Sequence, residues 1–195
     1  MKRFFVIFGS IILVVSVLFI HQTRWGISVS EAEVYLETYY EGKIENEISG
    51  YKSMGPEEFF SGSIQGWEYP EIFPSDKDED YCQAFVFLSL NNYSLLSHFL
   101  KDVYVINSAE NNGRLYMAFP PASSSDIDGF QRGQRRLAVY LFLYKNGRSD
   151  EEILRDLSEL KIELHYSNKV FQLTKTIDLS KVKLTLLDKN PFDPN

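Results

Sequence analysis

The chain opens with an uninterrupted apolar run. Lys2 and Arg3 precede it, and no charged residue occurs from Phe4 to Ile20. As a helix this run spans about 25 Å, and flanking basic side chains can reach the headgroups on both sides of a hydrocarbon core of about 30 Å. The pattern predicts a membrane-spanning helix, with residues 1–24 as a signal anchor and residues 4–20 in contact with lipid.

A cleaved signal peptide is the alternative interpretation of this run. Such a peptide needs a small-x-small site soon after its apolar region. Here His21 to Trp25 follow the run, and the first small pairs, Gly26/Ser28 and Ser28/Ser30, come late. We therefore favour an uncleaved anchor. Both interpretations export the domain, and the basic N-terminal residues keep that end cytoplasmic. The expected location is a cell membrane, crossed once, with a periplasmic or extracellular C-terminal domain.

Beyond the anchor, short apolar patterns predict strands. Residues 31–40 alternate with period 2, although Ser30 and Glu33 also form a capping box that would suit a short helix. Residues 84–90 and 137–144 are almost continuously apolar, which is typical of central strands buried on both faces. The residues expected at the centre of the core are Val86, Leu88, Val139, Leu141 and Leu143.

Turn and capping residues set other boundaries. Asn111-Asn112-Gly113 is a hairpin signal, and it predicts that a strand at 102–107 pairs with a returning strand at 114–119. Residues 120–133 are predicted to be a loop, and residues 93–100 fit either a short helix or a loop. Ser149 and Glu152 form a capping box before an apolar stripe, so a helix is predicted at 150–160.

The remaining segments complete a β-rich domain. Residues 161–166, 170–177 and 182–187 read as three further strands. Eight or nine short strands with one short helix predict a mostly-β fold, a β-sandwich covering residues 25–188. A flexible tail, residues 189–195, is expected to follow it.

Part of this pattern resembles the small immunoglobulin-like domains of bacterial exported lipoproteins and secreted antigens. An apolar strand ends in Leu88-Ser89-Leu90-Asn91-Asn92, and a Val-x-Val strand and a Gly-marked loop follow before the next long apolar strand. The resemblance covers residues 84–187 and implies an immunoglobulin-like sandwich that acts as an adhesion or binding module. The chain departs from it in the long segment 49–80, in the helix at 150–160 and in lacking a lipoprotein cysteine.

The segment 49–80 is predicted to be a long loop, because it is rich in Gly and Pro and lacks periodicity. Its aromatic residues are the candidate partner-binding group, since such rings give a large rigid contact area at little entropy cost. The alternative is that they pack as a satellite cluster under their own loop. They are Phe59, Phe60, Trp67, Tyr69 and Phe73.

Composition and charge exclude some functions. The net charge is −7, and no basic stripe interleaves with aromatic residues, so nucleic-acid binding is not expected. The single cysteine, Cys82, excludes an intramolecular disulfide and reads as a small buried hydrophobe. His98 and His165 have no ligand partners at zinc spacing, so no zinc site is predicted.

Two acidic stretches resemble weak calcium loops. Asp76, Asp78 and Asp80 have the alternate spacing, but Tyr81 and Phe87 stand where an EF-hand needs Gly and Glu. Asp126, Asp128 and Gly129 form a shorter match. Acidic residues that cap turns are the simpler interpretation, and no metal or other cofactor is predicted.

The sequence therefore predicts a membrane-tethered, extracytoplasmic binding module, bacterial in character, whose ligand is a protein or an envelope polymer. No catalytic signature is present, so an enzyme is not expected. A glycan-directed hydrolase remains an alternative, as does an accessory subunit of a membrane complex. The hydrolase would use loop carboxylates, from Glu57, Glu58, Glu68, Glu71 and Asp76.

Overall fold

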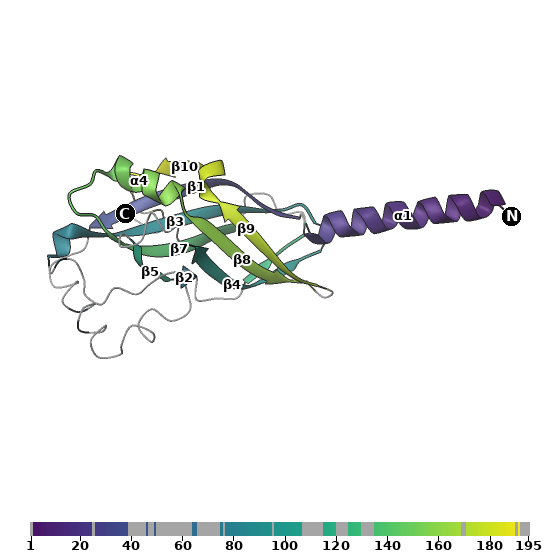
Figure 1. Cartoon of the computed structure of the whole chain (residues 1–195), viewed down its shortest axis with the longest axis horizontal. Coiled ribbons are helices and arrows are strands. Elements are labelled where there is room, and N and C mark those ends of the chain that lie inside the picture. The colour runs from purple at the N-terminus through teal and green to yellow at the C-terminus, as the bar shows by residue number, and fades with distance from the viewer. Residues whose placement is uncertain are drawn as a thin grey trace.

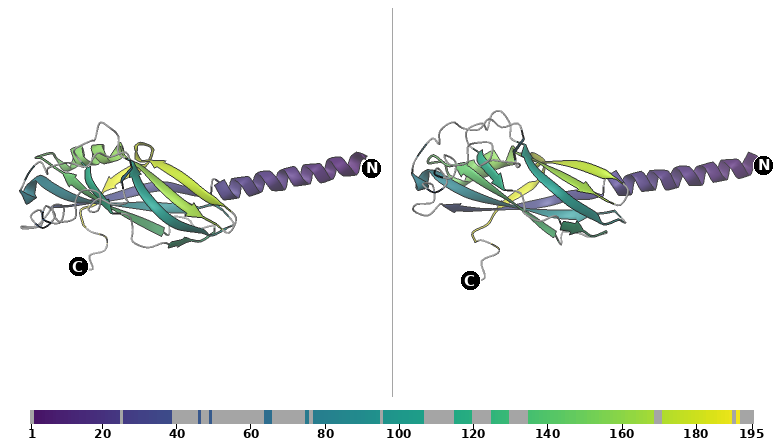
Figure 2. Two further views of the ribbon diagram at one scale, coloured as in Figure 1. Left: turned by 60° about the horizontal axis from the view of Figure 1, so that its bottom comes forward. Right: turned by 90° about the horizontal axis from the view of Figure 1, so that it is seen from below.

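The computed structural model describes residues 2–24, 26–38, 46, 49, 64–65, 75, 77–94, 96–106, 115–119, 125–129, 135–168, 171–189 and 191. A long helix, α1 (Lys2–Arg24), stands at one end of a β-rich domain (Figure 1). The helix projects along the long axis, so the N-terminus lies far from the strands in all three views (Figures 1 and 2). The described residues include no helix long and apolar enough to cross a membrane.

Two packed sheets form the domain. The first has the order β10-β1-β3-β7-β5, and the second has the order β2-β4-β8-β9 with β6 beside β4. The strands of the first sheet are β10 (Lys183–Leu186), β1 (Ile27–Thr38), β3 (Tyr81–Asn92), β7 (Arg135–Tyr144) and β5 (Leu115–Phe119). Those of the second are β2 (Ile64–Gln65), β4 (His98–Ile106), β8 (Lys161–Ser167), β9 (Gln172–Asp178) and β6 (Ser125–Ile127).

The core lies between the two sheets. Alternate residues of β8 are buried, as the pleat requires, and they join buried residues of β1, β3, β4 and β7 in one cluster. The five residues predicted for the centre of the core are all buried in β3 and β7, which pair antiparallel with Val86 opposite Val139. The mostly-β class is therefore confirmed, and the two sheets are consistent with a β-sandwich.

One short helix, α4 (Asp150–Ser158), closes a side of the sandwich, where it was predicted. The hydroxyl of Ser149 accepts from the amide of Glu152, and the Glu152 carboxylate accepts from the amide of Ser149. This capping box satisfies two amides at the helix start. Ile153 and Leu157 then enter the core. The 3₁₀ turns η1 (Asp78–Asp80) and η3 (Leu179–Lys181) precede β3 and β10.

The predicted hairpin at Asn111–Gly113 is wrong. β4 and β5 belong to different sheets: β4 pairs with β8, β6 and β2, whereas β5 pairs with β7. A turn signal reflects only local backbone preference. The burial of Val103 and Val105 in the core instead decides that β4 belongs to the second sheet.

Other boundaries also differ from the predictions. β1 begins at Ile27, and an irregularity between Val29 and Ala32 interrupts the alternation that marks a strand. The predicted loop at 120–133 contains β6, and the predicted loop at 49–80 contains β2, which pairs parallel with β4. Residues 98–100, part of a segment predicted as a short helix or a loop, belong to β4, and the described residues 93, 94, 96 and 97 are not helical.

Candidate functional site

The aromatic residues predicted to bind a partner, Phe59, Phe60, Trp67, Tyr69 and Phe73, lie outside the described residues. The same holds for the hydrolase carboxylates Glu57, Glu58, Glu68, Glu71 and Asp76. Both predictions stay as predictions. The site that the described residues do form is built from other elements.

The acidic stretches have structural contacts. The hydroxyl of Ser75 donates to the Asp80 carboxylate, and the Asp80 carbonyl accepts from the amides of Lys145 and Asn146 at 2.6 and 3.1 Å. Asp80 therefore ties the start of β3 to the turn after β7. Within the part of the chain that the structure describes, no three His, Cys, Asp or Glu residues converge as a metal site would need.

Cys82 is a buried thiol in β3. Burial raises its pKa to about 11, although Lys145 and Arg148 act in the opposite direction. Because the thiolate is the reactive species, this cysteine is chemically inert near neutral pH. His165 lies half-buried on the outer face of β8, where its Nε2 is 2.6 Å from Glu163 and its ring contacts Tyr104.

α4 is held at the end of β7 by charged side chains. The guanidinium of Arg148 contacts the Asp156 carboxylate and donates to the carbonyl of Tyr144. The ammonium of Lys145 is 3.0 Å from the Asp150 carboxylate. At the other end of the helix, the Leu179 amide donates to the Leu160 carbonyl at 3.1 Å. These contacts fix the start of α4 at the end of β7 and its C-terminal end next to η3.

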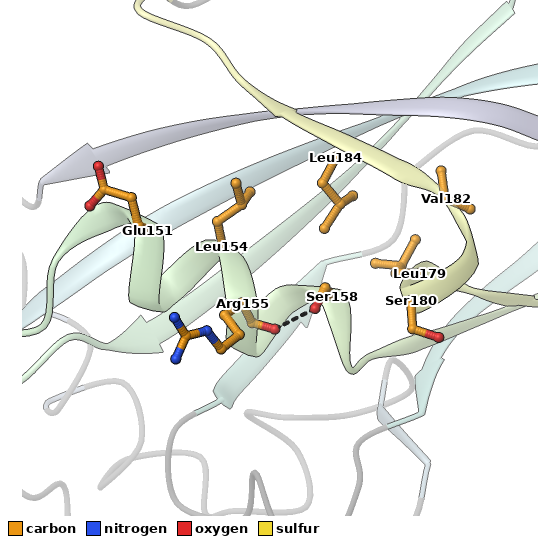
Figure 3. Close-up of a pocket in the computed structure, with 8 residues that line it drawn as sticks. All are labelled: Glu151, Leu154, Arg155, Ser158, Leu179, Ser180, Val182 and Leu184. Atoms are coloured by element: carbon orange, nitrogen blue, oxygen red, sulfur yellow. Dashed lines mark hydrogen bonds between the residues drawn. The ribbon is translucent and has the colours of Figure 1, made fainter.

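A groove of about 310 Å³ lies between α4, η3 and β10 (Figure 3). Four apolar residues line it: Leu154 on α4, Leu179 on η3, Leu184 on β10, and Val182 between η3 and β10. Polar groups stand around it, namely Glu151, Arg155, Ser158 and Ser180. Figure 3 shows Leu154 and Leu184 facing each other across the space. The volume is at the lower end of the range for ligand pockets, about 300–1,000 Å³.

One wall of the groove is an open sheet edge. Among the described strands, β10 pairs only with β1. The Leu187 amide donates to the Val34 carbonyl at 2.7 Å, so backbone groups of odd-numbered residues in β10 face β1. Because backbone direction alternates along a strand, the N–H and C=O of Leu184 and Leu186 face the open edge. The groove thus combines apolar side chains with main-chain donors and acceptors that have no strand partner among the described residues.

No protein-family model and no curated protein matches the chain. The function must therefore be argued from the groove, from the open edge and from the end of the domain next to α1.

The end next to α1 contains a buried polar cluster. Asn92 is fully buried, and its side-chain nitrogen lies 3.0, 3.2 and 2.9 Å from the carbonyl oxygens of Leu96, Ile127 and Asp128. Its side-chain oxygen accepts from the amide of Ser94 at 2.9 Å. One side chain thus holds together the end of β3, the following turn and β6.

His98 lies next to this cluster at the start of β4. It is 1% exposed, its ring makes an edge contact with Tyr166 at 5.2 Å, and neither ring nitrogen has a hydrogen-bond partner among the described residues. Burial lowers the pKa of His98, so the folded domain holds the neutral ring.

Sequence reasoning missed both the groove and this end. The groove joins residues about thirty positions apart, and Asn92 reaches carbonyls 35 and 36 residues later. Asn91, Asn92 and Ser94 follow an apolar strand, and this run was the available signal for the buried polar cluster.

Proposed function

We propose that this protein is a membrane-anchored, extracytoplasmic binding module that captures an extended segment of a partner protein in the groove between α4 and β10. The observation that carries this proposal is the open edge of β10 beside apolar side chains. An extended peptide adds a strand to such an edge: main-chain hydrogen bonds supply affinity, and pockets for alternate side chains supply specificity.

The groove meets both needs of strand addition. Leu184 and Leu186 offer outward N–H and C=O groups, while the half-buried Leu154 and Val182 offer an apolar surface for a side chain of the incoming strand. Glu151 and Arg155, one anion and one cation on the exposed side of α4, select the charges of that segment. The capping box and the Arg148 contacts keep α4 in place, so little ordering is needed on binding.

A photoreactive phenylalanine analogue tests the groove. Placed at Arg155 in the full chain in native membranes, it should give a discrete cross-linked protein, whereas the same group at Lys161, exposed at the start of β8, should not. Leu186→Pro removes an outward N–H that the fold does not use and should abolish the cross-link. Leu186→Ala loses similar packing but keeps the N–H, and should retain it. Equal cross-linking from Lys161, or survival of the product in Leu186→Pro, would contradict the proposal.

The anchoring half of the proposal rests on α1. Its side chains from Val6 to Ile20 are all exposed, and the large apolar ones are 42% to 68% exposed. An apolar surface of this extent on an isolated helix needs an apolar environment, which a bilayer supplies. The charge-free run from Phe4 to Ile20 and the preceding Lys2 and Arg3 support the same assignment, with the N-terminus inside.

Alkaline phosphatase fused after Ser30 tests the topology. The fusion should be enzymatically active, because that enzyme matures only outside the cytoplasm, and the purified protein should keep its apolar N-terminus. A mature N-terminus near Glu31 would overturn the anchor while sparing export, and an inactive fusion would overturn both.

The immunoglobulin-like resemblance of residues 84–187 fits this role, because loops and edges on such sandwiches commonly bind partners. We propose it as the origin of the domain. The two packed sheets are compatible with it.

A further inference from the structure

We propose that the domain rests directly on the lipid bilayer through four exposed side chains at its α1 end: Tyr93, Leu96, Phe99 and Phe171. We call this group the apolar collar. The inference deepens the anchoring half of the proposed function and rests on it. It adds that the sandwich contacts the membrane surface itself, instead of standing free of it on a flexible tether.

The first argument is where apolar side chains are exposed. In the described part of the domain outside α1, the exposed large hydrophobic residues are these four, at 45%, 36%, 40% and 41%. They come from two separate turns and one strand, yet they gather at one end. Single exposed apolar residues scattered over a surface are ordinary, whereas a gathered set marks an interaction surface.

Strand register shows that they share that end. Ile27, at the start of β1, pairs with Asn92, and the Tyr93 amide donates to the Gly26 carbonyl at 2.6 Å. Phe99 pairs with Ser167, the last residue of β8, so the turn containing Phe171 lies at the same level. In Figures 1 and 2 the strands meet α1 at this end, while α4 lies toward the opposite one.

The collar is continuous with α1, and this identifies its occupant. The ring of Phe171 is 5.8 Å from that of Phe19, near the end of the charge-free run that closes at Ile20. If that run is in lipid, Phe171 lies at the boundary of the hydrocarbon. Tyr93 suits that depth, because tyrosine combines an apolar ring with a polar hydroxyl, whereas the wholly apolar ring of Phe171 suits the hydrocarbon side of the boundary.

The turns that carry the collar are fixed before any contact with lipid. Asn92 binds the carbonyl of Leu96, and the Ser94 hydroxyl accepts from the Leu96 amide at 3.0 Å. In the other turn, the Phe171 amide donates to the Asn168 side chain at 2.8 Å. The buried polar groups at this end therefore fix the two turns in a conformation that leaves the collar side chains exposed.

The described charged residues on the strands next to Phe99 are acidic or balanced, so we expect apolar insertion to contribute more to membrane contact than attraction by anionic lipids. Asp126 lies opposite Phe99 in the strand pair, and the Asp128 carbonyl accepts from the Asn92 side chain. Asp126 and Asp128 are both exposed. Lys101 and Asp102 on β4 are also exposed and offset each other. Contact should therefore depend on apolar insertion and persist on a zwitterionic surface.

Spin-label accessibility in the full chain tests the collar. We would place a nitroxide on Leu96→Cys, Phe171→Cys, Val14→Cys or Glu151→Cys, one at a time, in phosphatidylcholine vesicles. The native thiol of Cys82 is buried and should stay unlabelled at neutral pH. The ratio of oxygen to nickel-chelate accessibility separates lipid from water. Val14 serves as the lipid reference, and Glu151, on α4, as the water reference.

We expect ratios at Leu96 and Phe171 several-fold above that at Glu151, and unchanged when anionic lipid is added. Leu96 is a second, independent position should Phe171→Cys misfold. Water-like ratios at both collar positions with a lipid-like Val14 would overturn the collar but leave the anchor intact. A water-like Val14 would overturn the anchor as well. A collar ratio that rises only with anionic lipid would show electrostatic docking and would also overturn the proposal.

Discussion

Replacing Leu141 with alanine should lower the free energy of unfolding by about 2–5 kcal/mol. Leu141 is 1% exposed in β7, between Ala84 of β3 and Ala118 of β5. Both strand neighbours are small, so they cannot expand into the space that the leucine leaves. The cavity cost therefore adds to the lost transfer free energy. Urea unfolding of the full chain in detergent, followed by circular dichroism, gives the measurement.

Leu186→Ala is the matched control. Leu186 is only partly buried, on the edge strand β10, so its truncation should cost less than half as much. A loss below about 1 kcal/mol for Leu141→Ala, or one equal to that of Leu186→Ala, would mean that β7 is not a central strand.

Asn92→Asp should cost about 3–5 kcal/mol at neutral pH. The substitution is nearly isosteric, but it turns a donor that faces three carbonyl oxygens into an acceptor carrying a buried negative charge. The new carboxyl should have a pKa raised above its unfolded value of about 4. A raised folded-state pKa favours the folded state at low pH, so the deficit relative to wild type should shrink as the pH falls from neutral towards about 4 and should be smallest below that pH.

Asn146→Asp controls for the chemistry of the change. Asn146 is exposed in the turn after β7 with φ of 45°, a conformation that aspartate also tolerates. The free energy of unfolding of Asn146→Asp should therefore stay within about 0.5 kcal/mol of the wild-type value. A small, pH-independent loss for Asn92→Asp would show that Asn92 does not hold the two turns and β6 together.

The elements that local chemistry specifies were predictable. The capping box at Ser149 and Glu152 defines the start of α4 within four residues of sequence. The apolar runs around Val86 and Leu141 need burial on both faces, which only central strands provide. The turn at Asn168 joins β8 to β9 directly, so their pairing follows from adjacency.

The pairing of strands that are distant in the sequence was not predictable. Asn111–Gly113 favours a hairpin, yet Leu115 begins a strand that pairs with β7, because burial in the core decides the sheet. The candidate site depends on such distant pairings. Leu154 and Leu184 meet only once β10 has joined β1, and Phe171 meets Phe19 only once β9 lies at the base of α1.

The pairing of β1 with β10 joins strands from opposite ends of the domain. Glu31 lies opposite Lys183, about 150 residues later. β1 is synthesised early, and the edge that pairs with β10 stays unpaired until residues 183–186 have been made. A chain that stops before β10 therefore leaves this edge of β1 open to other strands. Synthesis of β10 pairs this edge of β1, and β10 then becomes the edge strand of the sheet.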